Sequence, residues 1–288
     1  MMPEPADPPN RHRSVLFDVA YRITGDAAAA DDIVQDTLTR ALTRPPKDLS
    51  RPWRPWLVRV AANLARDHLR ARRRRAYLGP WLPTPLPVDT DPEDRLAGRQ
   101  AVGWATLVAM EALTPQQRTV LVLRDVVELR ATEVAELLAT TPEAVRAAHR
   151  RARRALNDLP EEPPALDAAI LEVAARLGQA LAQGDLAAMM AVLAPDVELR
   201  SDGANGRYTA AIHPVFGADR VARFLLGVST KGGPSEVTLV RRNDRMAFRI
   251  ERHEAPRRYA KVSELLVVLG ANGRIAHVHI VLGEGSER

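Results

Sequence analysis

Arginine gathers in two stretches of this chain, residues 53–75 and 142–156. In the first stretch apolar side chains recur every three or four residues, which predicts an amphipathic helix. The opposite face of that helix carries guanidinium groups from Arg59, Arg66, Arg70 and Arg73. A row of guanidinium groups suits successive phosphates, so this stretch predicts binding to a polyanion. A charged face that contacts only solvent is the alternative.

The second stretch has the spacing of a helix-turn-helix motif. Thr132–Leu138 predicts a short helix, residues 139–141 a tight turn, and Pro142 the start of the next helix. That helix would place its N-terminal half in a major groove, with Glu143, Arg146, Ala147 and Arg150 facing outward. Phosphate contacts are expected from Arg151, Arg153 and Arg154. A helical hairpin that binds no DNA is the alternative, and a generic DNA-binding regulator would share the pattern.

Two tryptophans, Trp53 and Trp56, open the first arginine stretch. Aromatic rings beside a basic groove favour binding of single-stranded nucleic acid, because any base can stack on them. Both rings could equally belong to the core of a small domain.

An aspartate and three histidines of the C-terminal half are candidates for catalysis: Asp202, His213, His277 and His279. An Asp/His pair inside a pocket could perform acid–base chemistry. His277 and His279 alternate on a predicted strand and so share a face. Nothing else in the spacing supports a metal site, and surface or structural roles are favoured. We therefore expect no catalytic residue, no metal and no cofactor.

Composition limits the function classes. The 288 residues include no cysteine, which excludes disulfides, thiolate zinc sites and iron–sulfur clusters. No apolar run is long enough to span a membrane, and the acidic, proline-rich N-terminus does not resemble a secretory signal, so a cytoplasmic location is expected. The net charge of +5 comes from the first 160 residues, with 25 basic and 20 acidic side chains. A polyanionic partner would bind there.

The pattern of elements predicts a multidomain protein. Helices are expected over residues 11–75, with a break at Thr24–Asp26, and again over residues 95–159, with N-caps at Thr114 and Thr141. Between them, residues 76–94 hold five prolines and should run extended. Beyond residue 164, two helices precede five alternating strands that begin near residues 197, 236, 245, 264 and 275, with a helix near 218–226 and a hairpin turn at 271–273. The expected domains are residues 11–75, a proline-rich linker 76–98, residues 99–160 and an α+β domain 164–288.

Taken in order, these stretches resemble an extracytoplasmic-function sigma factor, a promoter-recognition subunit of bacterial RNA polymerase. Residues 16–25 and 30–36 look like the polymerase-binding part of sigma domain 2, and residues 113–125 with the helix-turn-helix look like sigma domain 4. The resemblance implies that Asp32, Gln35 and Asp36 bind core polymerase, although an ordinary acidic surface is the alternative. It assigns −35 DNA to the second arginine stretch. It assigns −10 DNA to Trp53, Trp56, Arg59, Asn63, Arg66, Arg70 and Arg73.

Residues 77–85 resemble the linker motif of sigma factors fused to a SnoaL-like domain of the nuclear-transport-factor-like fold, a sheet closed by helices into a cone. Thr84 stands where that motif usually has glutamate, and a C-terminal element of the branch is absent. In the Asp-Gly element of the branch, Asp202 and Gly203 are kept and Arg207 stands in for lysine. The resemblance implies regulation in cis through Tyr77, Trp81, Leu82, Pro83, Asp202, Gly203 and Arg207.

The sequence therefore predicts a sigma factor with core RNA polymerase and promoter DNA as partners. It also leaves room for an unidentified small ligand in the cone. The alternative is a helix-turn-helix transcriptional regulator whose SnoaL-like domain binds a ligand or acts as an enzyme.

Overall fold

The computed structural model describes residues 8–46, 48, 52–74, 79–87, 103–157, 168–204 and 206–283. Their contacts divide the chain into two compact units. The helical unit contains the described residues up to 74 and those from 106 to 157, and the C-terminal unit contains 79–87, 103–105 and 168–283. Within the described residues, no helix combines the length and apolar character needed to cross a bilayer.

The helical unit begins with a short 3-10 turn, η1 (Pro9–His12), and three helices, α1 (Arg13–Thr24), α2 (Ala27–Thr43) and α3 (Trp53–Arg74). The predicted break between the first two is confirmed. Gly25 ends α1 in the left-handed region at φ 71°, where glycine carries no steric cost, and the Asp26 side chain accepts a hydrogen bond from the Ala29 N–H to start α2. One apolar face of each helix forms the core.

Four further helices complete the helical unit: α5 (Trp104–Met110), whose first residues group with the C-terminal unit, α6 (Pro115–Asp125), α7 (Ala131–Leu138) and α8 (Pro142–Asn157). Both predicted N-caps are confirmed. Thr114 forms a capping box with Gln117, and Thr141 accepts a hydrogen bond from the Ala144 N–H. Ala139 takes a left-handed conformation that ends α7, so α7 and α8 form the predicted helix-turn-helix.

The C-terminal unit is an α+β domain. Two helices, α9 (Ala168–Gln183) and α10 (Leu186–Val192), lead into a six-stranded sheet of order β2-β1-β6-β5-β4-β3. The strands are β1 (Leu193–Asp202), β2 (Val215–Phe216), β3 (Glu236–Arg242), β4 (Arg245–Glu251), β5 (Val262–Leu269) and β6 (Ile275–Gly283), and α11 (Ala218–Lys231) follows β2. β1 and β6 pair parallel, and the other neighbours pair antiparallel. The two-residue β2 and the last turn of α11 were not predicted.

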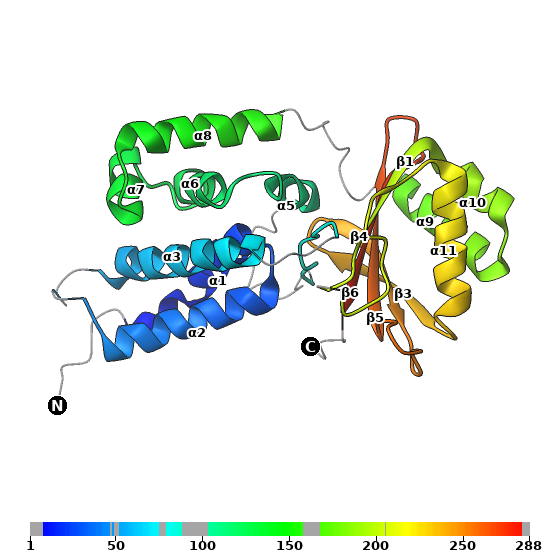
Figure 1. Ribbon diagram of the computed structural model, residues 1–288, viewed down its shortest axis with the longest axis horizontal. Coiled ribbons are helices and arrows are strands. Elements are labelled where there is room, and N and C mark those ends of the chain that lie inside the picture. Colours follow the sequence, from blue (N-terminus) through cyan, green and yellow to red (C-terminus); the bar gives the residue numbers. More distant parts are fainter. Residues whose placement is uncertain are drawn as a thin grey trace. The chain divides into compact units, whose positions relative to one another are not determined.

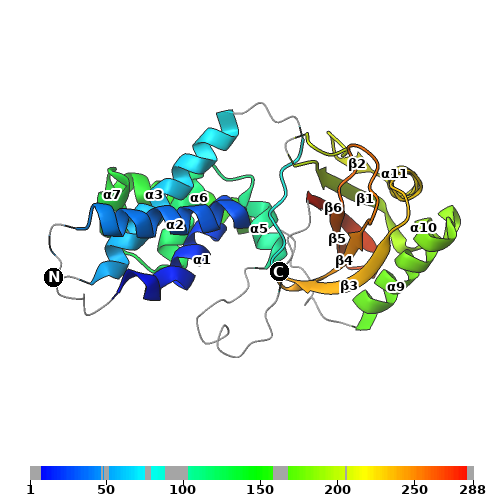
Figure 2. The same cartoon turned by 90° about the horizontal axis from the view of Figure 1, so that it is seen from below.

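The two faces of this sheet differ in character. Leu199, Leu265 and Val278 belong to the apolar core together with residues of α9, α10 and α11. These three helices cover one face of the sheet (Figure 1). The turned view shows the same three helices beside the sheet (Figure 2). Because side chains alternate along a strand, Glu198, Arg200 and Asp202 of β1, with His277 and His279 of β6, lie on the opposite face. The polar candidates are therefore on the face away from the helix-covered core.

Candidate nucleic-acid and regulatory interfaces

The predicted −10 residues lie along α3, but they differ in exposure. Arg59 and Arg70 are exposed, and Trp56, Asn63 and Arg66 are half-buried. Trp53 is only 6% exposed and packs edge-to-face on Trp56, with ring centroids 6.1 Å apart. In this arrangement the Trp53 ring is a core residue, the alternative considered for it above, and has no free face for a base.

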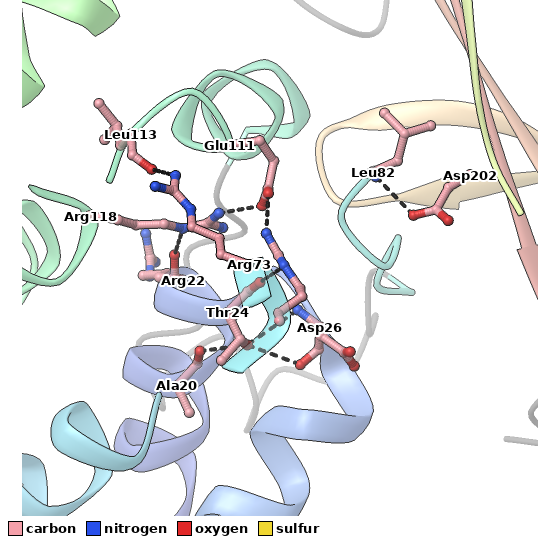
Figure 3. Close-up of polar contacts among 11 residues, drawn as sticks. Ala20, Arg22, Thr24, Asp26, Arg73, Leu82, Glu111, Leu113, Arg118 and Asp202 are labelled. Atoms are coloured by element: carbon pink, nitrogen blue, oxygen red, sulfur yellow. Dashed lines mark hydrogen bonds and ion pairs between the residues drawn. The ribbon is translucent and has the colours of Figure 1, made fainter. Parts of the chain in front are cut away.

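The last turn of α3 is bound to other parts of the helical unit. Arg72 donates to the Thr24 carbonyl (2.9 Å) and to the Glu111 carboxylate. Arg73, predicted to contact −10 DNA, donates to the Leu113 carbonyl (Figure 3). The guanidinium of Arg73 is therefore already engaged within the protein.

A buried charge network surrounds Glu111. Arg118 of α6 is 1% exposed, donates from Nε to the Arg22 carbonyl of α1 (2.9 Å) and pairs through Nη1 with Glu111 (Figure 3). Glu111 also pairs with Arg72 of α3. Burial lowers the pKa of Arg118 and the Glu111 charge opposes that change. The network joins α1 and α3 to α6 within one unit.

The recognition helix α8 presents its predicted DNA-contacting side chains to solvent, with Glu143, Arg146, Arg150, Arg151, Arg153 and Arg154 exposed and Ala147 half-buried. Glu143 and Arg146 pair with each other at 2.6 Å. Asp125 at the end of α6 binds His149 Nε2 (2.7 Å) and Arg153 Nε (3.1 Å). Asp125 therefore fixes the middle of α8 against α6, and one predicted phosphate ligand takes part in that contact.

The predicted polymerase-binding residues share one surface of α2. Asp32, Gln35 and Asp36 are exposed, whereas Ile33 and Val34 between them are buried. Their side chains are thus available to a partner protein.

The C-terminal unit holds part of the linker motif. Leu82 is 2% exposed, and its N–H donates to Asp202 Oδ2 (3.0 Å), while the other carboxylate oxygen accepts from the Ala204 N–H (2.9 Å). Pro83 is buried and Trp81 is half-buried. A Cβ on Gly203 would lie 2.9 Å from both the Ala210 Cβ and the Tyr208 carbonyl oxygen, so the local chain path requires glycine.

The residue directly after the linker motif, Leu86, pairs with the turn between β3 and β4. Asn243 donates its N–H to the Leu86 carbonyl (2.8 Å) and accepts the Leu86 N–H through Oδ1 (3.0 Å). We call Asp202, Gly203 and Asn243 the linker cradle. Arg207 is exposed, and Tyr77 lies outside the described residues.

The catalytic candidates do not assemble into an acid–base site. His279 is buried and accepts the indole N–H of Trp104 at Nδ1 (2.8 Å), and burial lowers its pKa to about 3. His277 Nδ1 lies 3.6 Å from a Glu198 oxygen, and His213 is exposed. Asp202 is bound to backbone amides. Among the described residues no three histidine or acidic side chains are grouped to bind a metal.

Sequence comparisons agree with this arrangement. Residues 10–75 match Sigma-70 region 2, and residues 105–156 match Sigma-70 region 4. The ECF RNA polymerase sigma factor SigJ of Mycobacterium tuberculosis is 40% identical over 231 residues, which are 77% of this chain and 72% of that protein. The chain belongs to the extracytoplasmic-function (ECF) sigma factors. Probable ECF sigma factor SigI of the same organism is 31% identical over 220 residues, covering 75% of this chain and 73% of that protein.

The crystal structure of M. tuberculosis SigJ extends this ECF similarity over both units. It matches with a TM-score of 0.69 and 31% identity, covering 95% of this chain and 94% of that one. The predicted fold class is confirmed: helical sigma domains are followed by an α+β domain of the SnoaL-like fold. This ECF factor is therefore a transcription initiation factor that acts with RNA polymerase at promoters. The stand-alone regulator is not favoured, because it leaves the region 2 match unexplained.

Several residues that organise these interfaces were missed from the sequence. They are Trp104, Glu111, Arg118, Asp125, His149 and Asn243. Arg118 stands beside the buried run Thr119–Leu123, and a charged residue at the edge of such a run is a usable sign of a buried ion pair. Glu111 lies seven positions from its partner Arg118, and the remaining residues pair with partners at least 24 positions away, so they carry no local signal.

Proposed function

We propose that the C-terminal domain regulates this ECF sigma factor in cis by binding the linker motif. The linker cradle carries the proposal. A buried carboxylate, Asp202, accepts a backbone N–H from the linker, and Leu82 is removed from water beside it. Burial of a leucine side chain stabilises docking by about 2 kcal/mol, and the amide–carboxylate bond adds about 1.5–3 kcal/mol. A hold of this size changes the populations of docked and undocked linker.

The individual contacts with polymerase and promoter belong to the same proposal. Asp32, Gln35 and Asp36 bind core RNA polymerase. The exposed side chains of α3 bind −10 DNA, the outward side chains of α8 bind −35 duplex, and the protein works in the bacterial cytoplasm as a non-enzymatic factor. The domains that belong to this proposal are residues 11–75, 76–98, 99–160 and 164–288. A small ligand of the C-terminal domain would act by competing for the linker cradle.

Run-off transcription with purified core polymerase and a cognate promoter tests the linker proposal. The variants are Asp202→Asn, Trp81→Ala and a deletion from Pro163 onward, and the matched control is Asp196→Asn, an exposed acid on the same strand. We expect each of the first three to change transcript yield at least about threefold, which corresponds to less than 1 kcal/mol in the docking equilibrium. If all three match the wild type, regulation through the linker is wrong.

A further inference from the structure

Two consecutive residues in the turn between β3 and β4 form hydrogen bonds with two separate segments of the chain. Asn243 pairs with Leu86, which directly follows the linker motif. Asp244 accepts a hydrogen bond from the backbone N–H of Trp104, at 2.7 Å. Trp104 and its neighbours, residues 103–105, group with the C-terminal unit.

Trp104 is anchored by its side chain as well. The ring is fully buried, its Nε1 donates to His279 Nδ1 at 2.8 Å, and the two ring centroids are 5.9 Å apart. A buried indole N–H needs an acceptor, and a neutral imidazole provides one. His279 stays neutral because it is buried and faces His277, Arg200 and Arg245, all of which disfavour a positive charge.

The backbone contact has a separate physical basis. Trp104 is the first residue of α5, where a helix leaves its N–H groups without intrahelical partners. A carboxylate at this end satisfies a donor and also interacts favourably with the helix dipole. Trp104 is therefore fixed at three points: its ring, its indole nitrogen and its backbone. It directly precedes the region 4 match, which starts at residue 105.

We propose that Asp244 and His279 form a second hold of the C-terminal domain, distinct from the linker cradle, which positions the start of region 4 through Trp104. This second hold adds to the proposed cis regulation. Only its expected effect on transcription rests on that proposal. Region 4 reads the −35 element while region 2 reads the −10 element. When regions 2 and 4 separate to read these two elements, a fixed start of region 4 samples fewer positions than a start held by the chain alone. The second hold therefore narrows the range of promoter spacer lengths that the protein accepts.

Hydrogen exchange of the full chain tests the second hold directly. His279→Leu removes the acceptor, and Trp104→Phe keeps an aromatic six-membered ring but removes the indole N–H. The control is His277→Leu, a more exposed histidine on the same face of β6. We expect the first two variants to speed exchange in peptides covering residues 103–110 about tenfold and to leave residues 79–87 within about twofold of the wild type, because only one hold is broken. Asp202→Asn should speed exchange in residues 79–87 and leave residues 103–110 close to the wild type.

Normal exchange in residues 79–87 also shows that a variant is folded. If both hold variants leave residues 103–110 unchanged, or if His277→Leu has the same effect as His279→Leu, the second hold does not exist as described.

Run-off transcription on promoters with spacers shortened or lengthened by one and two base pairs tests the consequence. For each protein, the transcript yield on an altered spacer is divided by its yield on the best spacer. This ratio should be at least about threefold higher for Trp104→Phe and His279→Leu than for the wild type. An unchanged spacer profile alongside faster exchange would overturn the positioning role. If instead Asp202→Asn and the deletion from Pro163 leave the yield unchanged, the linker proposal fails, and the exchange result for Trp104 stands or falls separately.

Discussion

Replacement of Glu111 by glutamine should destabilise the helical unit strongly. The Glu111 carboxylate pairs with both Arg118 and Arg72, and these three side chains join α1, α3 and α6. Glutamine has almost the same shape but no charge. The substitution therefore leaves two guanidinium groups close together, with Arg118 inaccessible to solvent.

The size of the effect follows from burial. Breaking a buried ion pair by removal of one partner costs about 3–5 kcal/mol. Two features reduce the expected cost of Glu111→Gln below this range. The glutamate side chain is 14% exposed, and Arg118 keeps its bond to the Arg22 carbonyl. We expect a loss of about 2–3 kcal/mol in the free energy of unfolding, which lowers the Tm of the helical unit by about 6–9 °C.

Scanning calorimetry on the full chain measures this shift, and hydrogen exchange in peptides of α1 and α6 assigns it to the helical unit. The matched control is Glu143→Gln, which breaks an exposed ion pair with Arg146 and should cost at most about 0.5 kcal/mol. A second variant, Arg118→Met with Glu111→Gln, should be less destabilised than the two single effects added together, because the buried Arg118 charge is then absent. Only Arg72, which is partly exposed and keeps its bond to the Thr24 carbonyl, still loses an ion-pair partner. A Tm for Glu111→Gln within about 2 °C of the wild type would refute the burial argument.

Three further outcomes are expected. Because burial lowers the pKa of His279 to about 3, the unfolded state binds more protons than the folded state below pH 6.5. From pH 7.5 to pH 5 the free energy of unfolding of the C-terminal unit, measured by urea unfolding, should therefore fall by about 2 kcal/mol more than that of a His279→Gln variant, and equal losses would contradict the burial of a neutral His279. Arg150→Ala should weaken binding to a −35 duplex by about 1–3 kcal/mol in fluorescence anisotropy but barely affect binding to unrelated DNA. Arg154→Ala should weaken binding to both DNAs alike and reduce by about one the slope of log binding constant against log salt concentration. Equal behaviour of the two variants would contradict their roles. Gly203→Ala should expose Leu82, because the new methyl group clashes with Tyr208 and Ala210, and normal hydrogen-exchange protection of residues 79–87 would count against the linker cradle.

Much of the fold follows from local sequence signals. The glycine at position 25 and the caps at Asp26, Thr114 and Thr141 mark helix ends because each supplies a hydrogen bond or a backbone conformation on the spot. Strand alternation likewise placed five of the six strands, and it placed His277 and His279 on a common face. These features depend on residues a few positions apart, and a single sequence contains that information.

The candidate sites were less predictable where distant residues meet. Arg73 has the spacing of a DNA ligand, yet its guanidinium binds the Leu113 carbonyl 40 positions away. The position of Trp53 on the helical wheel does not tell a core ring from a stacking platform, and its burial depends on how α3 packs against its neighbours. Asp202 was identified through the family motif, but its acceptance of the Leu82 N–H depends on a loop path that no local rule predicts.

The turn formed by Asn243 and Asp244 has a consequence for how such proteins can change over evolutionary time. One residue holds the linker and the next holds the start of region 4, so a single inserted or deleted codon would displace both contacts in one step. Substitutions can adjust either contact alone, because each uses a different side chain. We therefore expect functional variants of this chain to keep the length of this turn while its residue types drift, and a deep mutational library with single-codon insertions at residues 242–245 would measure that difference in tolerance.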